Sequence, residues 1–288
     1  MRNYKSMNEL NIALHLYPEA SFKRLTLGYE GRVFLLKVND KSLVLKFYSQ
    51  TRAQHYPQIL NNQTKLLSLL SDNKIGAPTM YDSHRIYNCL CYLYVEGTQI
   101  IPNKDDLKKI IHYLKRLKSL DITKFDFLHK ISYNDILREL KNTEQYDTFY
   151  NVFLQDELQI LNSEIPNETI SHGDFHHGNM IWSNNSADLT LIDWDEAIIA
   201  SNEWDISRFF VSHAIYSGIE EAYYFLSLCR EEFCINNEIL SFYIHYNAYN
   251  CLIRFNKWNN CFWGKNNNMT HQQTRQLLKK IITLKLVL

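Results

Sequence analysis

Glycine and proline are scarce in this chain of 288 residues, which contains only 8 glycines and 5 prolines. Disordered chains are usually enriched in both and poor in apolar residues, whereas this sequence is 45% hydrophobic and 14% aromatic. We therefore expect a folded globular protein with a sizeable core. Its length fits one large domain or two lobes that share a cleft.

Net charge is also lacking, because 31 Lys and Arg residues balance 31 Asp and Glu residues. Without an overall electrostatic field, the chain is not expected to bind nucleic acid or anionic lipid. No apolar run is long enough to span a bilayer, and polar residues interrupt positions 1–20, where a signal peptide would need an apolar segment. These absences predict a cytoplasmic protein without a membrane partner, and they leave the oligomeric state open.

The cysteines show neither the paired C-x-x-C spacing of a metal site nor the density of a disulfide scaffold. Disulfides and a cysteine-bound metal are therefore not expected to stabilise this fold. We expect reduced thiols at all six positions, namely Cys89, Cys91, Cys229, Cys234, Cys251 and Cys261.

The first third of the chain has the pattern of strands with few helices. A short helix is predicted near Met7–Leu16, and three strand-like runs, FKRLTL, RVFLLKV and SLVLKFY, follow within Phe22–Tyr48. Apolar residues with helical spacing come next at Leu60–Leu70, and a strand pair is predicted around Arg85–Val95. Together they predict a five-stranded antiparallel sheet with one or two helices in residues 1–96.

Beyond Gly97 the pattern changes to helices, and we place a lobe boundary there, between residues 1–96 and 97–288. Asp105–Leu120 has one apolar face and one lysine-rich face, as an amphipathic helix should. Further helices are predicted at Ser132–Ser163, Ile219–Glu232, Asn237–Asn256 and Thr270–Leu286.

The segment from Thr169 to Asp205 carries the residues best suited to chemistry. Its two short apolar strands, MIW and LTLID, flank the turn SNNSAD, and such a hairpin presents the polar residues at both ends on one side. We therefore expect Asp174, Asn179 and Asp193 to converge. Phosphoryl transfer needs a carboxylate that orients the acceptor hydroxyl and oxygen ligands that hold Mg²⁺ on the phosphates, and these residue types supply both.

The pattern H-G-D-x-x-x-x-N, followed by an apolar strand that ends in I-D-W, resembles the catalytic signature of the aminoglycoside phosphotransferase and choline kinase superfamily. The resemblance implies a protein-kinase-like α+β fold, with an antiparallel sheet in the N-terminal lobe and a mainly helical C-terminal lobe. It implies that Asp174 is the catalytic base and that Asn179 and Asp193 bind Mg²⁺. It also implies supporting roles for His172 and for Asp205, which follows a tryptophan and braces the catalytic loop.

ATP is then expected between a nucleotide-binding lobe, residues 1–96, and a helical lobe, residues 97–288, that holds the catalytic loop and the acceptor. Lys46 would contact the phosphates, and backbone amides at Gly28 and Gly31 would cover them. The main chain near Glu96 would bind adenine, with the Glu96 side chain at the site or only on its rim. A plain hairpin turn at the glycines and an outward-facing lysine remain the alternatives.

One departure from the family concerns the partner of Lys46. The helix predicted at Leu60–Leu70 has no glutamate to pair with this lysine, and only Asn62, Gln63 or the more distant Asp72 are available. A nucleotide-binding pseudokinase therefore stays open as an alternative. A metal-binding helix with histidines at positions 172 and 176 is disfavoured, because glycines at 173 and 178 interrupt it.

The acceptor implied by the resemblance is a hydroxyl of a small molecule. Glu238 is the only acidic residue between positions 237 and 288, so a polycationic aminoglycoside would lack partners for its ammonium groups there. Aromatic side chains such as Trp258 and Trp263 favour instead one cation, as in choline, ethanolamine or a thiamine-like compound. Core packing of the aromatics and an antibiotic acceptor that confers resistance remain alternatives. For an antibiotic acceptor, Asp195, Glu196 and Glu203 could bind one or two of the amines.

Overall fold

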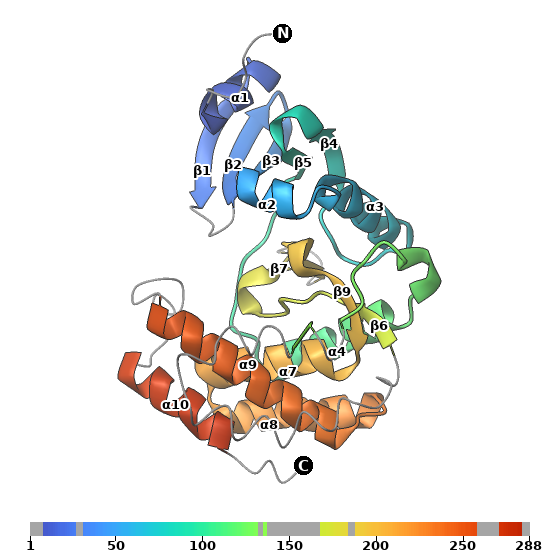
Figure 1. Cartoon of the computed structure of the whole chain (residues 1–288), viewed down its shortest axis with the longest axis vertical. Coiled ribbons are helices and arrows are strands. Elements are labelled where there is room, and N and C mark those ends of the chain that lie inside the picture. Colours follow the sequence, from blue (N-terminus) through green and yellow to red (C-terminus); the bar gives the residue numbers. More distant parts are fainter. Residues whose placement is uncertain are drawn as a thin grey trace. The chain divides into compact units, whose positions relative to one another are not determined.

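The computed structural model describes residues 8–26, 31–131, 135–136, 168–183, 188–257 and 271–283 (Figure 1). The chain divides into two compact units. The first unit combines Met1–Thr98 with Ile181–Asp195, and the second combines Gln99–Met180 with Glu196–Leu288. Residues 181–195 therefore group with the first unit, although the sequence pattern had assigned them to the helical lobe. The proposed lobe boundary itself stays a prediction.

A five-stranded sheet with strand order β1-β2-β3-β5-β4 forms most of the first unit, and all of its neighbouring strands are antiparallel. This confirms the predicted sheet. Its strands are β1 (Ser21–Thr26), β2 (Gly31–Val38), β3 (Lys41–Tyr48), β4 (Met80–His84) and β5 (Cys89–Leu93).

The strand pair predicted around Arg85–Val95 was placed wrongly. Strand β4 lies entirely before this range, and a 3-10 turn, η2 (Arg85–Tyr87), connects it to β5. Asn88 ends that turn in the left-handed conformation, with φ of 51°. Strand β4, with the sequence MYDSH, is mostly polar and partly exposed. It therefore lacks the apolar pattern by which a strand is recognised in a sequence.

Among the described residues of the first unit, three helices accompany the sheet, one more than the upper limit of the prediction. They are α1 (Glu9–Leu16), α2 (Gln50–His55) and α3 (Ile59–Asp72). The missed helix, α2, has six residues and no buried side chain, so it lacks an apolar face, although Ser49 caps its first turn by accepting from Arg52 N.

Strand β3 divides its side chains between two sets of packed residues. Leu43, Leu45 and Phe47 pack in the cluster that contains α1 residues, whereas Tyr48 packs with Ile59 and Leu60 of α3. Because side chains alternate along a strand, Lys46 lies on the same face as Tyr48. The lysine therefore faces the side of the sheet that α3 covers.

The hairpin of β7 (Met180–Trp182) and β8 (Leu189–Leu191) is joined to the first unit by backbone hydrogen bonds. Thr98 and Trp182 exchange two of them, at 3.0 and 2.9 Å, and Leu191 N donates to Gly76 O at 2.9 Å. A Cβ atom at Gly76 would lie 2.2 Å from Leu189 O. Glycine therefore permits this close approach, and the predicted hairpin is confirmed.

The second unit is mainly helical. Its two-stranded antiparallel sheet consists of β6 (Glu168–Ser171) and β9 (Ile198–Ser201). Helix α7 contacts α8 and α9, and α9 contacts α10. The elements are α4 (Lys104–Lys118), η3 (Ile122–Phe125), η5 (His177–Asn179), η6 (Trp194–Glu196) at the unit boundary, α7 (Glu203–Ser217), α8 (Ile219–Glu232), α9 (Asn237–Lys257) and α10 (His271–Thr283).

The structure confirms four predicted helices of the second unit, α4, α8, α9 and α10, to within a few residues at their ends. The prediction for Ser132–Ser163 lies almost wholly outside the described residues. Helix α7 was missed. Nearly all of its residues are buried, so it has no solvated face to produce an amphipathic pattern. None of the described helices is long and apolar enough to cross a membrane.

Candidate active site

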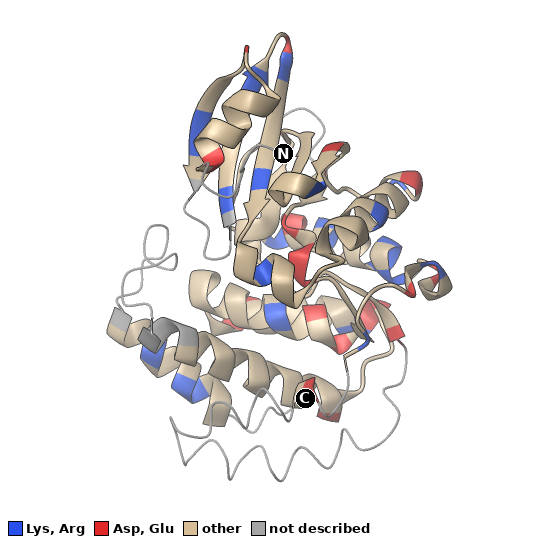
Figure 2. Ribbon diagram, turned by 45° about the horizontal axis from the view of Figure 1, so that its top comes forward, with Lys and Arg blue, Asp and Glu red and all other residues tan. Residues whose placement is uncertain are grey.

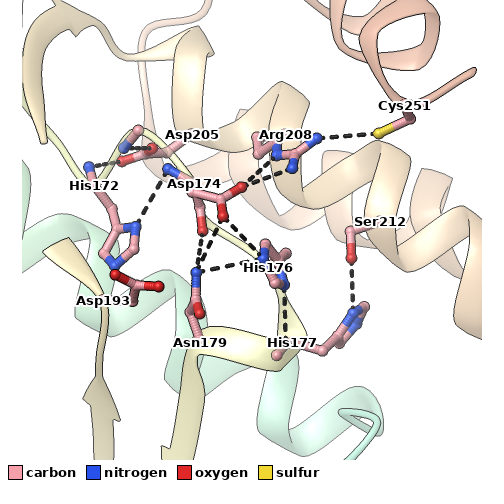
Figure 3. A network of polar contacts seen from close by, with 12 residues as sticks. His172, Asp174, His176, His177, Asn179, Asp193, Asp205, Arg208, Ser212 and Cys251 are labelled. Atoms are coloured by element: carbon pink, nitrogen blue, oxygen red, sulfur yellow. Dashed lines mark hydrogen bonds and ion pairs between the residues drawn. The ribbon is translucent and has the colours of Figure 1, made fainter. Parts of the chain in front are cut away.

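The loop that follows β6 is held by the carboxylate of Asp205, in the first turn of α7 (Figure 3). Its Oδ2 accepts from His172 N at 2.8 Å, and its Oδ1 accepts from Gly173 N at 3.1 Å. Gly173 has φ of 84°, and a Cβ atom there would lie 1.8 Å from Glu196 O. Only glycine fits this position, and the two bonds from Asp205 fix the backbone immediately before Asp174.

Asp174 is fixed by a buried guanidinium. Arg208 of α7 donates from Nε at 3.0 Å and from Nη2 at 2.7 Å to the same oxygen, Oδ1. The second oxygen, Oδ2, contacts His176 Nε2 at 3.1 Å. Burial on its own raises the pKa of the Asp174 carboxyl, but His176 and Arg208 outweigh it and hold the pKa well below its usual range. Asp174 is therefore ionised at neutral pH.

Arg208 is in turn bound by Cys251 of α9, to whose Sγ its Nη1 donates at 3.0 Å. Its side chain is only 8% exposed. The sequence analysis did not select this residue, although one signal was present: an arginine within the apolar run of α7 needs a buried partner. Arg208 connects the loop, α7 and α9 at the position of Asp174.

Asn179 closes the loop. Its Nδ2 donates to Asp174 O at 2.9 Å, so its side-chain oxygen is directed away from that contact and is of the type that Mg²⁺ prefers. His176 Nδ1 accepts from Gly178 N at 3.0 Å, which orders the turn between them. The segment is a loop ending in η5 rather than a continuous helix. Among the described residues, no group of three or more His, Cys, Asp and Glu side chains is placed to hold a metal ion.

A buried histidine of the loop, His177, packs against α7 through Ser212 and a second buried histidine, His213. His177 contacts Ser212 Oγ through Nδ1 at 2.9 Å and His213 Nδ1 through Nε2 at 3.1 Å. Burial lowers the pKa of His213 to about 4, and burial together with the neighbouring histidines lowers the pKa of His177 well below its usual value. Both imidazoles are therefore neutral at pH 7.

In the first unit, Lys46 contacts two carboxylates that are two residues apart. Its Nζ lies 2.5 Å from Asp193 Oδ1 and 2.8 Å from Asp195 Oδ2. Burial lowers the pKa of Lys46, but Asp195 and Asp193 outweigh it and raise the pKa well above its usual value. The lysine is thus charged, and its side chain is only 11% exposed.

The two carboxylates differ in exposure. The Asp193 side chain is 51% exposed, and its backbone has a positive φ of 64°, which an aspartate tolerates better than most residues. The Asp195 side chain is only 9% exposed, and its Oδ1 accepts from Tyr48 Oη at 2.9 Å. Burial and the nearby Asp195 raise the pKa of Tyr48 well above its usual value, so the phenol stays protonated as a donor. Asp193 is therefore the more accessible of the pair for an incoming cation.

The other predicted site residues are more dispersed. Glu96 is exposed just after β5, Gly31 begins β2, and Gly28 lies outside the described residues. Glu196 is exposed, whereas Glu203 is buried and accepts from Asn236 N at 2.8 Å.

The aromatic residues considered for acceptor binding are either buried in the core or outside the described residues. The tyrosines of α9 are buried, and Tyr243 packs edge-on against Trp204, with ring centroids 5.0 Å apart. These rings form core, which was the alternative reading. Trp258 and Trp263 lie outside the described residues.

The model of the phosphotransferase enzyme family matches residues 21–224. Among solved structures, the amicoumacin kinase hAmiN in complex with AMP-PNP, Ca²⁺ and Ami has a TM-score of 0.68 at 14% identity, with 98% of this chain and 96% of that chain covered.

Two further solved structures are similar over nearly their whole length. APH(2")-IIia in complex with GDP and kanamycin gives a TM-score of 0.67 at 16% identity, covering 94% of this chain and 97% of that chain. Choline kinase LicA from Streptococcus pneumoniae gives a TM-score of 0.65 at 16% identity, covering 94% of this chain and 98% of that chain. No curated protein sequence matches this chain. At such low identities, the structural similarity establishes the kinase-like α+β fold.

Proposed function

The chain belongs to the phosphotransferase enzyme family, and we propose that it transfers the γ-phosphoryl group of ATP to a hydroxyl of a small molecule, with Mg²⁺ as the metal. The observation that carries this proposal is Asp174, an ionised carboxylate fixed by Arg208 and His176 within the signature loop. The Asp174 side chain is 27% exposed, so a substrate can reach a carboxylate whose orientation is already fixed.

Asp174 is proposed to orient the acceptor. The hydroxyl donates its hydrogen bond to the carboxylate, its oxygen attacks the γ-phosphorus, and the bond from that phosphorus to the bridging oxygen of ADP breaks. The proton passes to Asp174 and then to solvent. The low pKa of Asp174 suits this role, because phosphoryl transfer has a loose transition state in which positioning matters more than base strength.

Asn179 and Asp193 are the proposed Mg²⁺ ligands. Their side chains offer an amide oxygen and a half-exposed carboxylate, which match the oxygen ligands that this ion prefers. When bound, Mg²⁺ supplies neutralisation of the negative charge that develops on the phosphate oxygens. Lys46 is proposed to contact the phosphates with its ammonium group. Asp205 is proposed to act by holding the loop, through its bonds from His172 N and Gly173 N.

For the acceptor, we propose a compound with a single positive charge, such as choline, ethanolamine or a thiamine-like cation. Two of the three acids considered for an aminoglycoside are committed elsewhere, since Asp195 is bound by Lys46 and Glu203 by Asn236 N. Helix α10 carries basic residues and no acidic one (Figure 2). Both facts disfavour a polycation, whose ammonium groups each need a partner.

A screen for ATP consumption tests this proposal, with amino alcohols, thiamine-like cations, sugars and hydroxyl-bearing antibiotics as acceptors. The expected result is ADP formation that depends on the acceptor, and a product heavier than the acceptor by one phosphoryl group. Comparison of kcat/KM ranks the acceptor classes. A higher value for kanamycin-type compounds than for the amino alcohols would assign the chain to antibiotic modification instead.

A further inference from the structure

Helix α3 covers the sheet face that carries Lys46, yet it offers this lysine no carboxylate. Its only acidic residue is Asp72, at the last position of the helix. Gln63 is buried on α3, and its Nε2 donates to Trp194 O at 2.8 Å. The helix therefore contacts the segment between the two aspartates through an amide.

Asp195 has the contacts expected of a fixed partner for the lysine. Its Oδ2 lies 2.8 Å from Lys46 Nζ, and its Oδ1 accepts from Tyr48 Oη at 2.9 Å. Arg52 adds a hydrogen bond from Nη2 to Asp195 O at 3.4 Å, with Nη2 also 3.9 Å from Oδ2. Both carboxylate oxygens are thus engaged, and two elements of the first unit, β3 and α2, supply their partners.

Asp193 is less suited to this role. Its side chain is 51% exposed, compared with 9% for Asp195. It is also the proposed metal ligand, and a carboxylate that binds a cation is less available to hold the lysine. Asp195 is held more firmly, because one of its oxygens contacts Lys46 and the other accepts from Tyr48.

We propose that Asp195, fixed by Tyr48 and Arg52, is the positioning residue that aims Lys46 at the nucleotide phosphates. This inference rests on the proposed function and deepens it. It accounts for the absence of a central acid from α3, since the carboxylate comes instead from the segment that Gln63 holds. It also reassigns Asp195, considered above for the acceptor, to the nucleotide.

The first test is the Asp195→Asn variant, which keeps the size of the side chain and removes its charge. We expect its Kd for Mg·ADP, measured by calorimetry without any acceptor, to rise about tenfold, as for the loss of one hydrogen bond to a charged group. KM for ATP should rise similarly, while KM for the acceptor stays unchanged. Asp72→Asn is the matched control on α3 and should leave both nucleotide constants unchanged.

The second test places Asp195→Asn in a Lys46→Met background. If Asp195 acts through the lysine, the second change adds little to the Kd increase caused by the first. Two independent increases that multiply would contradict the inference, as would a rise confined to the acceptor KM. Asp195→Glu, which keeps the charge, should recover part of the nucleotide affinity, and Tyr48→Phe should lose less than Asp195→Asn.

Thermal melts separate misfolding from lost positioning. If Asp195→Asn fails to fold, Asp195→Glu and Tyr48→Phe carry the test, and nucleotide affinity of both at the wild-type level would overturn the inference. Failure of the wild-type protein to bind Mg·ADP would overturn the proposed function together with the inference. Normal wild-type binding with no change in the folded Asp195 variants would overturn the inference alone.

Discussion

Asp174 in the second unit and Asp195 in the first are both carboxylates held by a cation that is largely shielded from solvent, but the cations differ. Arg208 gives two hydrogen bonds to Asp174 and a third to Cys251, so its planar group is fixed at both ends. Lys46 is a single point charge shared between Asp195 and Asp193. An arginine suits a carboxylate that must keep one orientation, whereas a lysine can turn toward a ligand that arrives and leaves.

The largest effect is expected where the fixed carboxylate itself is removed. Asp174→Ala should lower kcat by roughly 10²–10⁴-fold, because the acceptor hydroxyl loses the group that orients it and takes its proton. Nucleotide affinity should change little. Product formation, Mg·ADP affinity and melting temperature are measured on the same sample, and near wild-type turnover in a folded variant would refute the role of Asp174.

Removing the accessible carboxylate of the first unit should act through the metal. Asp193→Ala is expected to abolish detectable transfer at ordinary Mg²⁺ concentrations, since an oxygen ligand is lost. Titration of activity against Mg²⁺ checks this. A shifted requirement for Mg²⁺ supports the assignment, and an unchanged requirement with normal activity would exclude Asp193 as a ligand.

A smaller effect is expected from loosening the arginine. Arg208→Lys keeps the charge but cannot make the same set of bonds, so kcat should fall about tenfold with KM for ATP unchanged. Because Arg208 helps to lower the pKa of Asp174, the acid limb of the kcat profile should also move to higher pH. A change in KM for ATP alone would show that Arg208 does not act on Asp174.

The smallest effect on activity is expected from the histidine pair of His177 and His213. Changes there should alter the stability of the fold instead. His213 is neutral when folded because burial lowers its pKa to about 4, so the unfolded chain takes up the proton first as pH falls. The neutral state of His213 therefore costs no stability above pH ~6.5. Below that pH the free energy of unfolding falls progressively, by about 2 kcal/mol near pH 5.

The His213→Phe variant checks this sign, since phenylalanine keeps a ring against Phe209, with which His213 stacks, and has no proton to gain. Unfolding is measured in denaturant at pH 7.5 and pH 5, values chosen to lie on either side of about 6.5. The variant should lose less stability between them than the wild type does. Part of the pH dependence of stability should remain in the variant, because His177 is also held neutral in the folded protein.

The sequence predicted more of the fold than of the contacts. Periodicity identified the sheet and four of the helices of the second unit, because it reports which face of an element is buried. It missed α7, whose residues are buried on almost all sides. The signature indicated Asp174, Asn179 and Asp193 by residue type and spacing, and their proposed roles await the experiments above.

The partners of these residues were not predictable from pattern. Arg208 is 34 residues from Asp174, and Tyr48 is 147 residues from Asp195. Periodicity shows that a residue is buried but not which distant side chain it meets. A partner for Lys46 was expected on or just after the helix at Leu60–Leu70, whereas the structure gives it Asp195, two residues after Asp193.

The most direct test of the central claim follows the γ-phosphoryl group itself. ATP labelled at the γ-phosphate is incubated with Mg²⁺, the best acceptor of the screen, and either the wild-type protein or Asp174→Ala. We predict labelled acceptor and ADP with the wild type, and labelling that is slower by roughly 10²–10⁴-fold with the folded variant, although it still binds Mg·ADP. Equal labelling by both proteins, or wild-type nucleotide binding without labelling of any acceptor, would contradict a phosphotransferase that acts through Asp174.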